Sequence, residues 1–297
     1  MEEGEPVRET SRGYLYAILG SLCGGAQPTL IKFLLENNSP VAITGLSFAL
    51  SGLILVFYHP RAKPAKGSIK YIIVFGLVGA LAAPLAYVIG LNETTAVNAS
   101  LLANGEILFT TVLAYSIFGE RLSMAQATRG LLIVAGIVVV STDLNMAHVQ
   151  FAQGLLGNVL ILGSTVGWAV ENNLLAAATK RFDVSSLSKF RNLLGGLVLT
   201  SFALVASTPF GFTPIETFVL VLLALCLSGA TFMFMAAIKR LGAIRMLLVW
   251  STSTVFGAFF ALVFLGEQIT LAQLAGGACI LLGVYLFRRN ERPMFVP

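Results

Sequence analysis

Carboxylates and carboxamides inside apolar stretches are the side chains of this sequence best placed to do chemistry. Glu106 lies near the middle of the apolar stretch 95–118, roughly 16 Å from either end at a helical rise of ~1.5 Å per residue. A carboxylate in hydrocarbon is costly unless it is protonated, paired or hydrated. We therefore predict that Glu106 takes up and releases protons; a neutral glutamic acid that only bonds two helices is the alternative.

Two asparagines share this stretch with Glu106. Asn98 precedes it by eight residues, about two turns of a helix, and would lie on a similar face, whereas Asn104 would point elsewhere. We predict that Asn98 contacts a small molecule bound in a cavity. A hydrogen bond between helices is an equally open interpretation of either asparagine.

The stretch 153–178 is the most polar of the apolar stretches. Glu171 and Asn172 follow Trp168 there, and we predict that all three line a cavity, with the indole as an aromatic wall. Solvation or pairing of Glu171 near the end of the helix, and packing of Trp168 against a neighbouring helix, remain open.

A polar run occupies residues 250–254, which read WSTST. We predict that Trp250 and Ser251 face the same cavity. By the internal repeat described below, Ser253 would occupy the position of Glu106. Helical Ser and Thr can also bond back to their own turn, which is the structural alternative.

Prolines interrupt two further stretches. Pro28 follows Gln27, and Pro84 precedes Tyr87 by three residues. Proline removes a backbone hydrogen bond, so each is predicted to be a hinge or kink, with Gln27 and Tyr87 lining the cavity. Kinks without a function are the alternative.

The elements that must position these residues are membrane-spanning helices. Hydrophobic residues make up 57% of the 297 residues and charged residues 11%, against about 25% charged in soluble domains. A spanning helix needs roughly 20 apolar residues. The sequence therefore predicts an all-α integral membrane protein with ten transmembrane helices, at about 13–35, 40–58, 69–91, 95–118, 122–142, 153–178, 184–208, 215–238, 242–265 and 269–287.

Basic residues indicate the orientation of these helices, because Lys and Arg near helix ends stay on the cytoplasmic side. With the N-terminus inside, all of the 19 Lys and Arg except Lys32 fall on or near that side. Lys189 and Arg191, within the predicted seventh helix, are counted there too. The segments 1–12 and 288–297 are then cytoplasmic tails.

Histidine and cysteine exclude several classes of function. Cys23, Cys226 and Cys279 lie in apolar stretches, and His59 and His148 stand alone at segment ends. These isolated residues provide neither the Cys and His cluster of a metal site nor the histidine of a hydrolase triad. We therefore predict no metal, no cofactor and no enzymatic activity. The net charge of +5 belongs to the cytoplasmic loops, so nucleic acid is not an expected partner.

A motif recurs within the chain. Residues 118–126 read FGERLSMAQ and residues 265–273 read LGEQITLAQ, 147 positions later. Glu120 and Glu267 are equivalent in the two copies. Each ends one helix before a turn, and we predict structural helix-end roles for both.

The motif indicates a duplication. The first five-helix repeat would cover 13–142 and the second 153–287, joined by a loop at 143–152. Because five is odd, the second copy would enter the membrane from the opposite side and form an inverted repeat. This architecture is typical of alternating access.

The chain resembles the drug/metabolite transporter superfamily, of the EamA type. The resemblance rests on the Gly119 to Arg121 turn, its copy at Gly266 to Gln268, the 5+5 layout and the length, and it departs from the usual pattern at Gln268. It implies a central cavity between the repeats. Members transport amino acids, drugs, other metabolites, nucleotide sugars or triose phosphates.

These observations lead to the hypothesis of an alternating-access exporter of a small amphipathic metabolite such as an amino acid, coupled to protons through Glu106. The alternatives are an uncoupled facilitator or exchanger of a drug, nucleotide sugar or organic phosphate, and a non-transporting membrane scaffold. The expected partners are a small-molecule substrate and membrane lipid. A monomer is compatible with the sequence, and a bacterial or archaeal plasma membrane is the expected setting.

Overall fold

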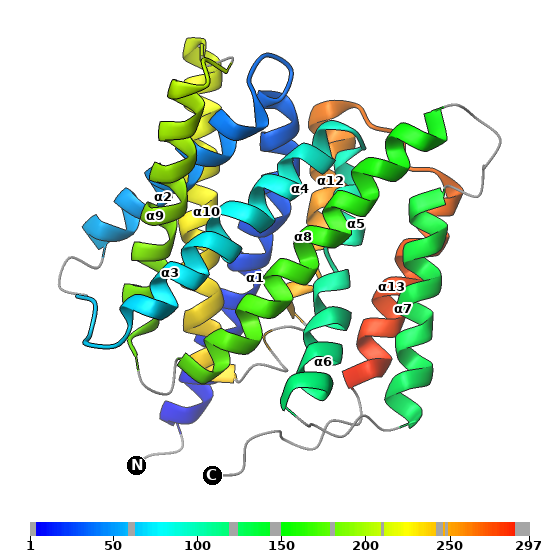
Figure 1. Ribbon diagram of the computed structural model, residues 1–297. Coiled ribbons are helices and arrows are strands. Elements are labelled where there is room, and N and C mark those ends of the chain that lie inside the picture. The colour runs from blue at the N-terminus through cyan, green and yellow to red at the C-terminus, as the bar shows by residue number, and fades with distance from the viewer. Residues whose placement is uncertain are drawn as a thin grey trace.

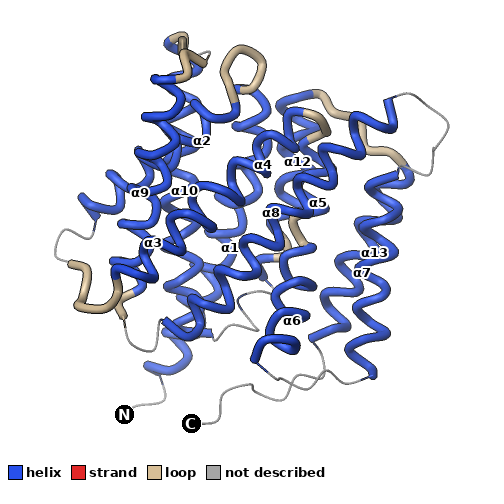
Figure 2. The backbone as a smooth tube through the Cα atoms, viewed as in Figure 1, coloured by secondary structure: helices blue, strands red, loops and turns tan. Residues whose placement is uncertain are grey.

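The structure is all helical, which confirms the predicted fold class at that level. A computed structural model shows no strand in the part of the chain that it describes (Figure 2). Those residues are 4–58, 63–118, 124–142, 150–178, 182–208, 211–241, 246 and 249–288.

The helices of the first half of the chain correspond to the first five predicted spans, two of which are divided. They are α1 (Gly4–Leu34), α2 (Pro40–Tyr58), α3 (Ile69–Leu77), the π-helical turn η1 (Val78–Ala82), α4 (Ala83–Asn92), α5 (Ala96–Leu102), α6 (Gly105–Phe118) and α7 (Met124–Thr142).

The second half follows the same order. Its described helices are α8 (Gln150–Ala178), α9 (Val184–Val205), α10 (Pro214–Leu241), α12 (Ser253–Leu265) and α13 (Leu271–Arg288). Two helices start before the predicted positions, α1 at Gly4 instead of 13 and α8 at Gln150 instead of 153. Hydropathy marks where hydrocarbon begins, whereas polar residues such as Glu and Arg are good helix formers and extend a helix beyond it.

Five of the described helical segments are long and apolar enough to cross a membrane. They are Pro40–Tyr58, Ile69–Asn92, Ala96–Leu113, Gly154–Leu175 and Pro214–Phe234. The start of α1 and the end of α13 lie at the same end of the helix bundle (Figure 1). The count of ten spans and the cytoplasmic side of that end stay predictions.

Helices of the two halves interlock. The main contacts pair α1 with α10, α4 with α8, α2 with α9, and α7 with α13. By their order in each half, α1 corresponds to α8, α2 to α9, α4 to α10, and α7 to α13. When each helix is exchanged for its counterpart, the α1–α10 contact becomes the α8–α4 contact. The α2–α9 and α7–α13 contacts are unchanged. The packing therefore has the approximate two-fold symmetry that a duplicated chain would produce.

Glycines allow the closest of these contacts. A Cβ added at Gly196 of α9 would overlap the backbone of Ala49 in α2. One added at Gly52 of α2 would lie 2.8 Å from the backbone nitrogen of Leu193 in α9. Because hydrocarbon offers no hydrophobic drive for helix association, close approach through small residues is what stabilises such pairs.

Two of the predicted spans are interrupted next to functional candidates. The predicted span 69–91 contains η1 just before Pro84, which lacks an amide hydrogen. The predicted span 95–118 breaks at Ala103–Asn104, between α5 and α6. A turn at Ser251–Thr252 likewise precedes α12, and the 147-residue offset aligns it closely with the break in the first half. By contrast, α1 continues through Pro28 as one helix.

Two sets of hydrogen bonds lie at the end of the bundle opposite to the start of α1, one within the first half and one between the halves. The amine of Lys32 donates to the carbonyls of Leu91 and Thr94, at 2.8 and 2.7 Å. The carboxylate of Glu267, in the second half, accepts from the backbone N–H groups of Ala96 and Val97, at 2.8 and 3.0 Å. We call these bonds the end-cap contacts. Lys32 is thus held at the end of α4.

Glu267→Gln is expected to destabilise this end of the protein. The amide puts an NH2 donor in place of one of the two oxygens, so one of the two N–H groups loses its acceptor, and the charge is lost. Hydrogen bonds to charged groups contribute about 1.5–3 kcal/mol, so thermal unfolding of the purified protein should occur at a lower temperature. Glu36→Gln, at an exposed position, is the control. Equal unfolding temperatures for both variants and the wild type would contradict the prediction.

Candidate transport cavity

A cavity of about 240 Å³ lies between the two halves of the chain. Helices of both halves contribute to it. The structure brings nine of the predicted site residues to its wall: Gln27, Pro28, Pro84, Tyr87, Glu106, Trp168, Glu171, Asn172 and Trp250.

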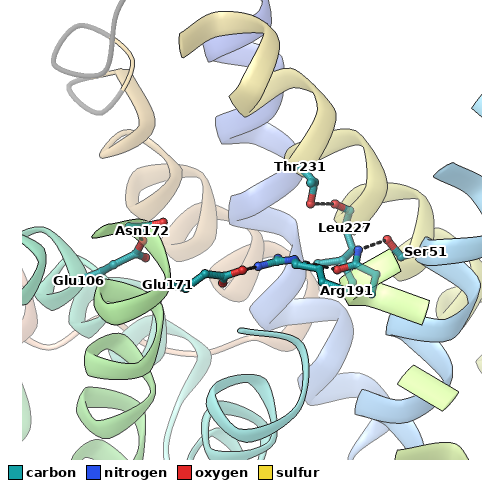
Figure 3. Close-up of polar contacts among 8 residues, drawn as sticks. Ser51, Glu106, Glu171, Asn172, Arg191, Leu227 and Thr231 are labelled. Carbon is teal, nitrogen blue, oxygen red and sulfur yellow. Dashed lines mark hydrogen bonds and ion pairs between the residues drawn. The ribbon is translucent and has the colours of Figure 1, made fainter. Parts of the chain in front are cut away.

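An ion pair joins α9 to α8 at this cavity. The guanidinium of Arg191 donates through Nη1 to the carboxylate of Glu171 (Figure 3). The two side chains are 16% and 5% exposed. Since removing a charge from water is costly without a partner, the pair explains how both groups can be buried here.

The other side of the guanidinium is also held. Its Nε donates to Oδ1 of Asn192 at 3.1 Å, and Nδ2 of Asn192 donates to the hydroxyl of Ser51 at 3.1 Å. Ser228 of α10 donates to the same hydroxyl oxygen at 3.0 Å. A polar network therefore runs from α8 through α9 to α2 and α10, along one side of the cavity.

Glu106 faces the cavity from the first turn of α6. The amide of Asn172 donates to its Oε1 (Figure 3). The break between α5 and α6 creates this position, because it places a carboxylate at a helix N-terminus, where negative charge is favoured. Asn104 at the break donates to the hydroxyl of Thr254 in α12, which ties the interruptions of the two halves together.

The π-helical turn makes room for the other carboxylate. A Cβ added at Gly79 of η1 would overlap the carboxyl group of Glu171. A π-helical turn is rare and frequently occurs at functional sites. Here it combines with a residue that has no side chain, so that Glu171 can remain close to Arg191.

Aromatic rings form two further parts of the wall. Tyr87 and Trp168 have ring centroids 5.5 Å apart at an angle of 46°. Phe234 and Trp250 are 5.0 Å apart and nearly perpendicular, at 83°. Both arrangements are favourable for aromatic pairs, so rigid apolar surfaces lie beside the charged groups.

Not every predicted site residue lies at the cavity. The side chain of Asn98 bonds to Thr94 Oγ1 at 3.1 Å and to Gln273 Nε2 at 2.9 Å, next to the end-cap contacts. Ser251 is not among the lining residues, whereas Ser253 is. Glu267 takes part in the end-cap contacts, and Glu120 lies outside the described residues.

Arg191 is the functional candidate that the sequence analysis missed. It was counted among the cytoplasmic basic residues, but its side chain lines the cavity. The available signal was a cation several residues inside the apolar stretch 184–208, since such a residue is a functional candidate by default.

Apolar helices of spanning length around a cavity that contains buried charged side chains define a multi-pass integral membrane protein. The chain belongs to the EamA-like transporter family, because the model of that family matches residues 11–142 and 155–289. The predicted family is thereby confirmed, and with it the class of transporter.

Relatives from archaea and bacteria span the whole chain. An "Uncharacterized transporter" of Methanothermobacter thermautotrophicus is 28% identical, with 98% of this chain and 90% of that protein covered. A "Probable amino-acid metabolite efflux pump" of Escherichia coli is 27% identical, with 91% and 92% covered. A crystal structure with 17% identity superposes with a TM-score of 0.65 over 93% of this chain and 96% of its own, a similarity of fold.

Proposed function

We propose that this transporter exports a small amphipathic metabolite, such as an amino acid, by alternating access and in exchange for protons bound at Glu106. The observation that carries the proposal is the cavity between the halves, in which a carboxylate, an ion pair and aromatic rings lie within a single wall.

The size and charge of the cavity favour a small, weakly charged solute. Its volume of about 240 Å³ is below the roughly 300–1,000 Å³ of sites for drug-sized ligands. Among its described lining residues, two carboxylates accompany one guanidinium. An organic phosphate or nucleotide sugar would add two negative charges to this environment. The names of two relatives, each a "Probable amino-acid metabolite efflux pump", agree with an amino-acid-like substrate.

The symmetry of the packing supports alternating access. The family model matches two stretches that nearly coincide with the predicted repeats 13–142 and 153–287. The end-cap contacts of Lys32 and Glu267 join helices at one end of the cavity. In an alternating-access cycle these bonds hold that end closed and break when it opens.

The test is counterflow in proteoliposomes that contain the purified protein. Labelled amino acids, cationic drugs, nucleotide sugars and organic phosphates are offered to vesicles loaded with the same unlabelled solute. We expect exchange of amino acids or close derivatives, and accumulation of the same solutes in the presence of a pH gradient. Exchange restricted to nucleotide sugars or phosphates, or no exchange of any class, would overturn the proposal.

A further inference from the structure

The guanidinium of Arg191 is fixed by the protein through two of its three nitrogen atoms. Nη1 bonds to Glu171, and Nε bonds to Asn192 at 3.1 Å. Within the described part of the chain, Nη2 has no hydrogen-bond acceptor. A guanidinium carries five N–H donors, so donors remain on a group that is already oriented.

These donors belong to a side chain in the cavity wall. Arg191 is 16% exposed on its side chain and lines the cavity. The planar fork of an arginine matches a carboxylate better than it matches any neutral group. A carboxylate in the cavity would supply the missing acceptors.

Glu171 limits the charge of the ligand that Arg191 can accept. Its carboxylate already balances the guanidinium, so a bound anion adds negative charge to the cavity. A substrate that also carries an ammonium group adds no net charge. Glu106 lies in the wall of the same cavity as the carboxylate that can face this ammonium.

We propose that Arg191 binds the carboxylate of a transported zwitterion, the class that includes α-amino acids, and that Glu171 positions the guanidinium for this contact. The proposal rests on the proposed function, because it specifies how that cavity selects its substrate. Arg191 is then the residue that distinguishes an amino acid from its carboxamide or its decarboxylated amine.

The experiment measures this selectivity in proteoliposomes that exchange labelled L-phenylalanine, or the fastest amino acid of the counterflow panel. Unlabelled amino acid, its carboxamide and its decarboxylated amine compete with the tracer. Charge-assisted hydrogen bonds predict that the wild type prefers the carboxylate by about 10- to 100-fold. In Arg191→Gln the preference should fall to within about 3-fold, and Arg191→Lys, which lacks the fork, should be intermediate.

Two further variants separate recognition from stability. Lys189→Gln removes a buried cation from the same helix that is not among the cavity-lining residues, and it should keep the wild-type preference. Glu171→Gln removes the charge that balances the guanidinium, so the N-acetylated amino acid, which carries a net negative charge, should compete with the tracer better than it does in the wild type. Should Arg191→Gln fail to fold, Arg191→Lys supplies the decisive ratio.

An unchanged preference for the carboxylate in the Arg191 variants, in vesicles that exchange amino acids, would overturn this inference and leave the proposed function intact. The absence of amino-acid exchange in the wild type would instead overturn the proposed function itself.

Discussion

Glu106→Gln should abolish accumulation driven by a pH gradient and preserve counterflow without a gradient. The substitution keeps the shape of the side chain, and its amide oxygen can still accept from Asn172, a partner of Glu106 in the structure. What it removes is the ability to bind a proton. Substrate can therefore still enter and leave the cavity, but its movement is no longer linked to protons.

The pH dependence of exchange should change in the same variant. On the proposed mechanism, protonation of Glu106 removes the negative charge that would face a substrate ammonium, so affinity in the wild type should fall as the pH is lowered. In Glu106→Gln the affinity should be nearly independent of pH over the same range. Binding measured at several pH values, alongside the uptake assay, follows both effects.

Glu36→Gln is the control for this experiment, because it makes the same chemical change at an exposed carboxylate that does not line the cavity. It should accumulate substrate as the wild type does. If Glu106→Gln still accumulates substrate in a pH gradient, Glu106 has only a structural role. The protons that drive accumulation must then bind to another group.

Gly196→Leu should prevent assembly of the helix bundle. A Cβ at this position already overlaps the backbone of Ala49, and a backbone cannot move aside as a flexible side chain can. Overpacking in a well-packed core costs about 1–3 kcal/mol, and separation of α2 from α9 would exceed this. We expect little or no monodisperse protein by size-exclusion chromatography after membrane extraction.

Gly163→Leu is the matched control on α8. An added Cβ there meets no atom within 4 Å, and the residue is exposed in the structure, so the leucine side chain would extend toward lipid. Its yield and elution profile should equal those of the wild type. Normal assembly of Gly196→Leu would show that the two helices are not held in close contact.

Much of the cavity could be predicted because hydrocarbon makes polar residues conspicuous. Glu106, Glu171 and Asn172 stand out in an apolar background, and all three line the cavity. Their partners could not be assigned in the same way, since the contact between Glu171 and Arg191 depends on how α8 and α9 pack.

Asn98 and Ser251 show where helical spacing fails. The eight-residue interval from Asn98 to Glu106 implies a shared face only if the helix is continuous. The chain breaks at Ala103–Asn104, so Asn98 turns to Gln273 while Glu106 faces the cavity. A turn at Ser251–Thr252 has the same effect in the second half, where Ser253 is the lining residue. Neither break contains a proline, although the first includes Asn104 followed by Gly105, a dipeptide typical of turns.

The helix-end role of Glu267 was predictable from its position before a turn, but its partners were not. The N–H groups that it binds belong to Ala96 and Val97, about 170 residues earlier in the chain. Only the packing of the two halves brings them together, so a residue that looked local in sequence joins distant segments.

The interlocked arrangement of the halves has a consequence for biosynthesis. The main packing partners of α1, α2, α4 and α7 all belong to the second half of the chain. When the ribosome has released only the first half into the membrane, α2 and α7 face lipid on the surfaces that will later contact α9 and α13. The nascent first half must therefore persist in the bilayer as loosely associated helices, and the native bundle forms only after the last helix has been inserted.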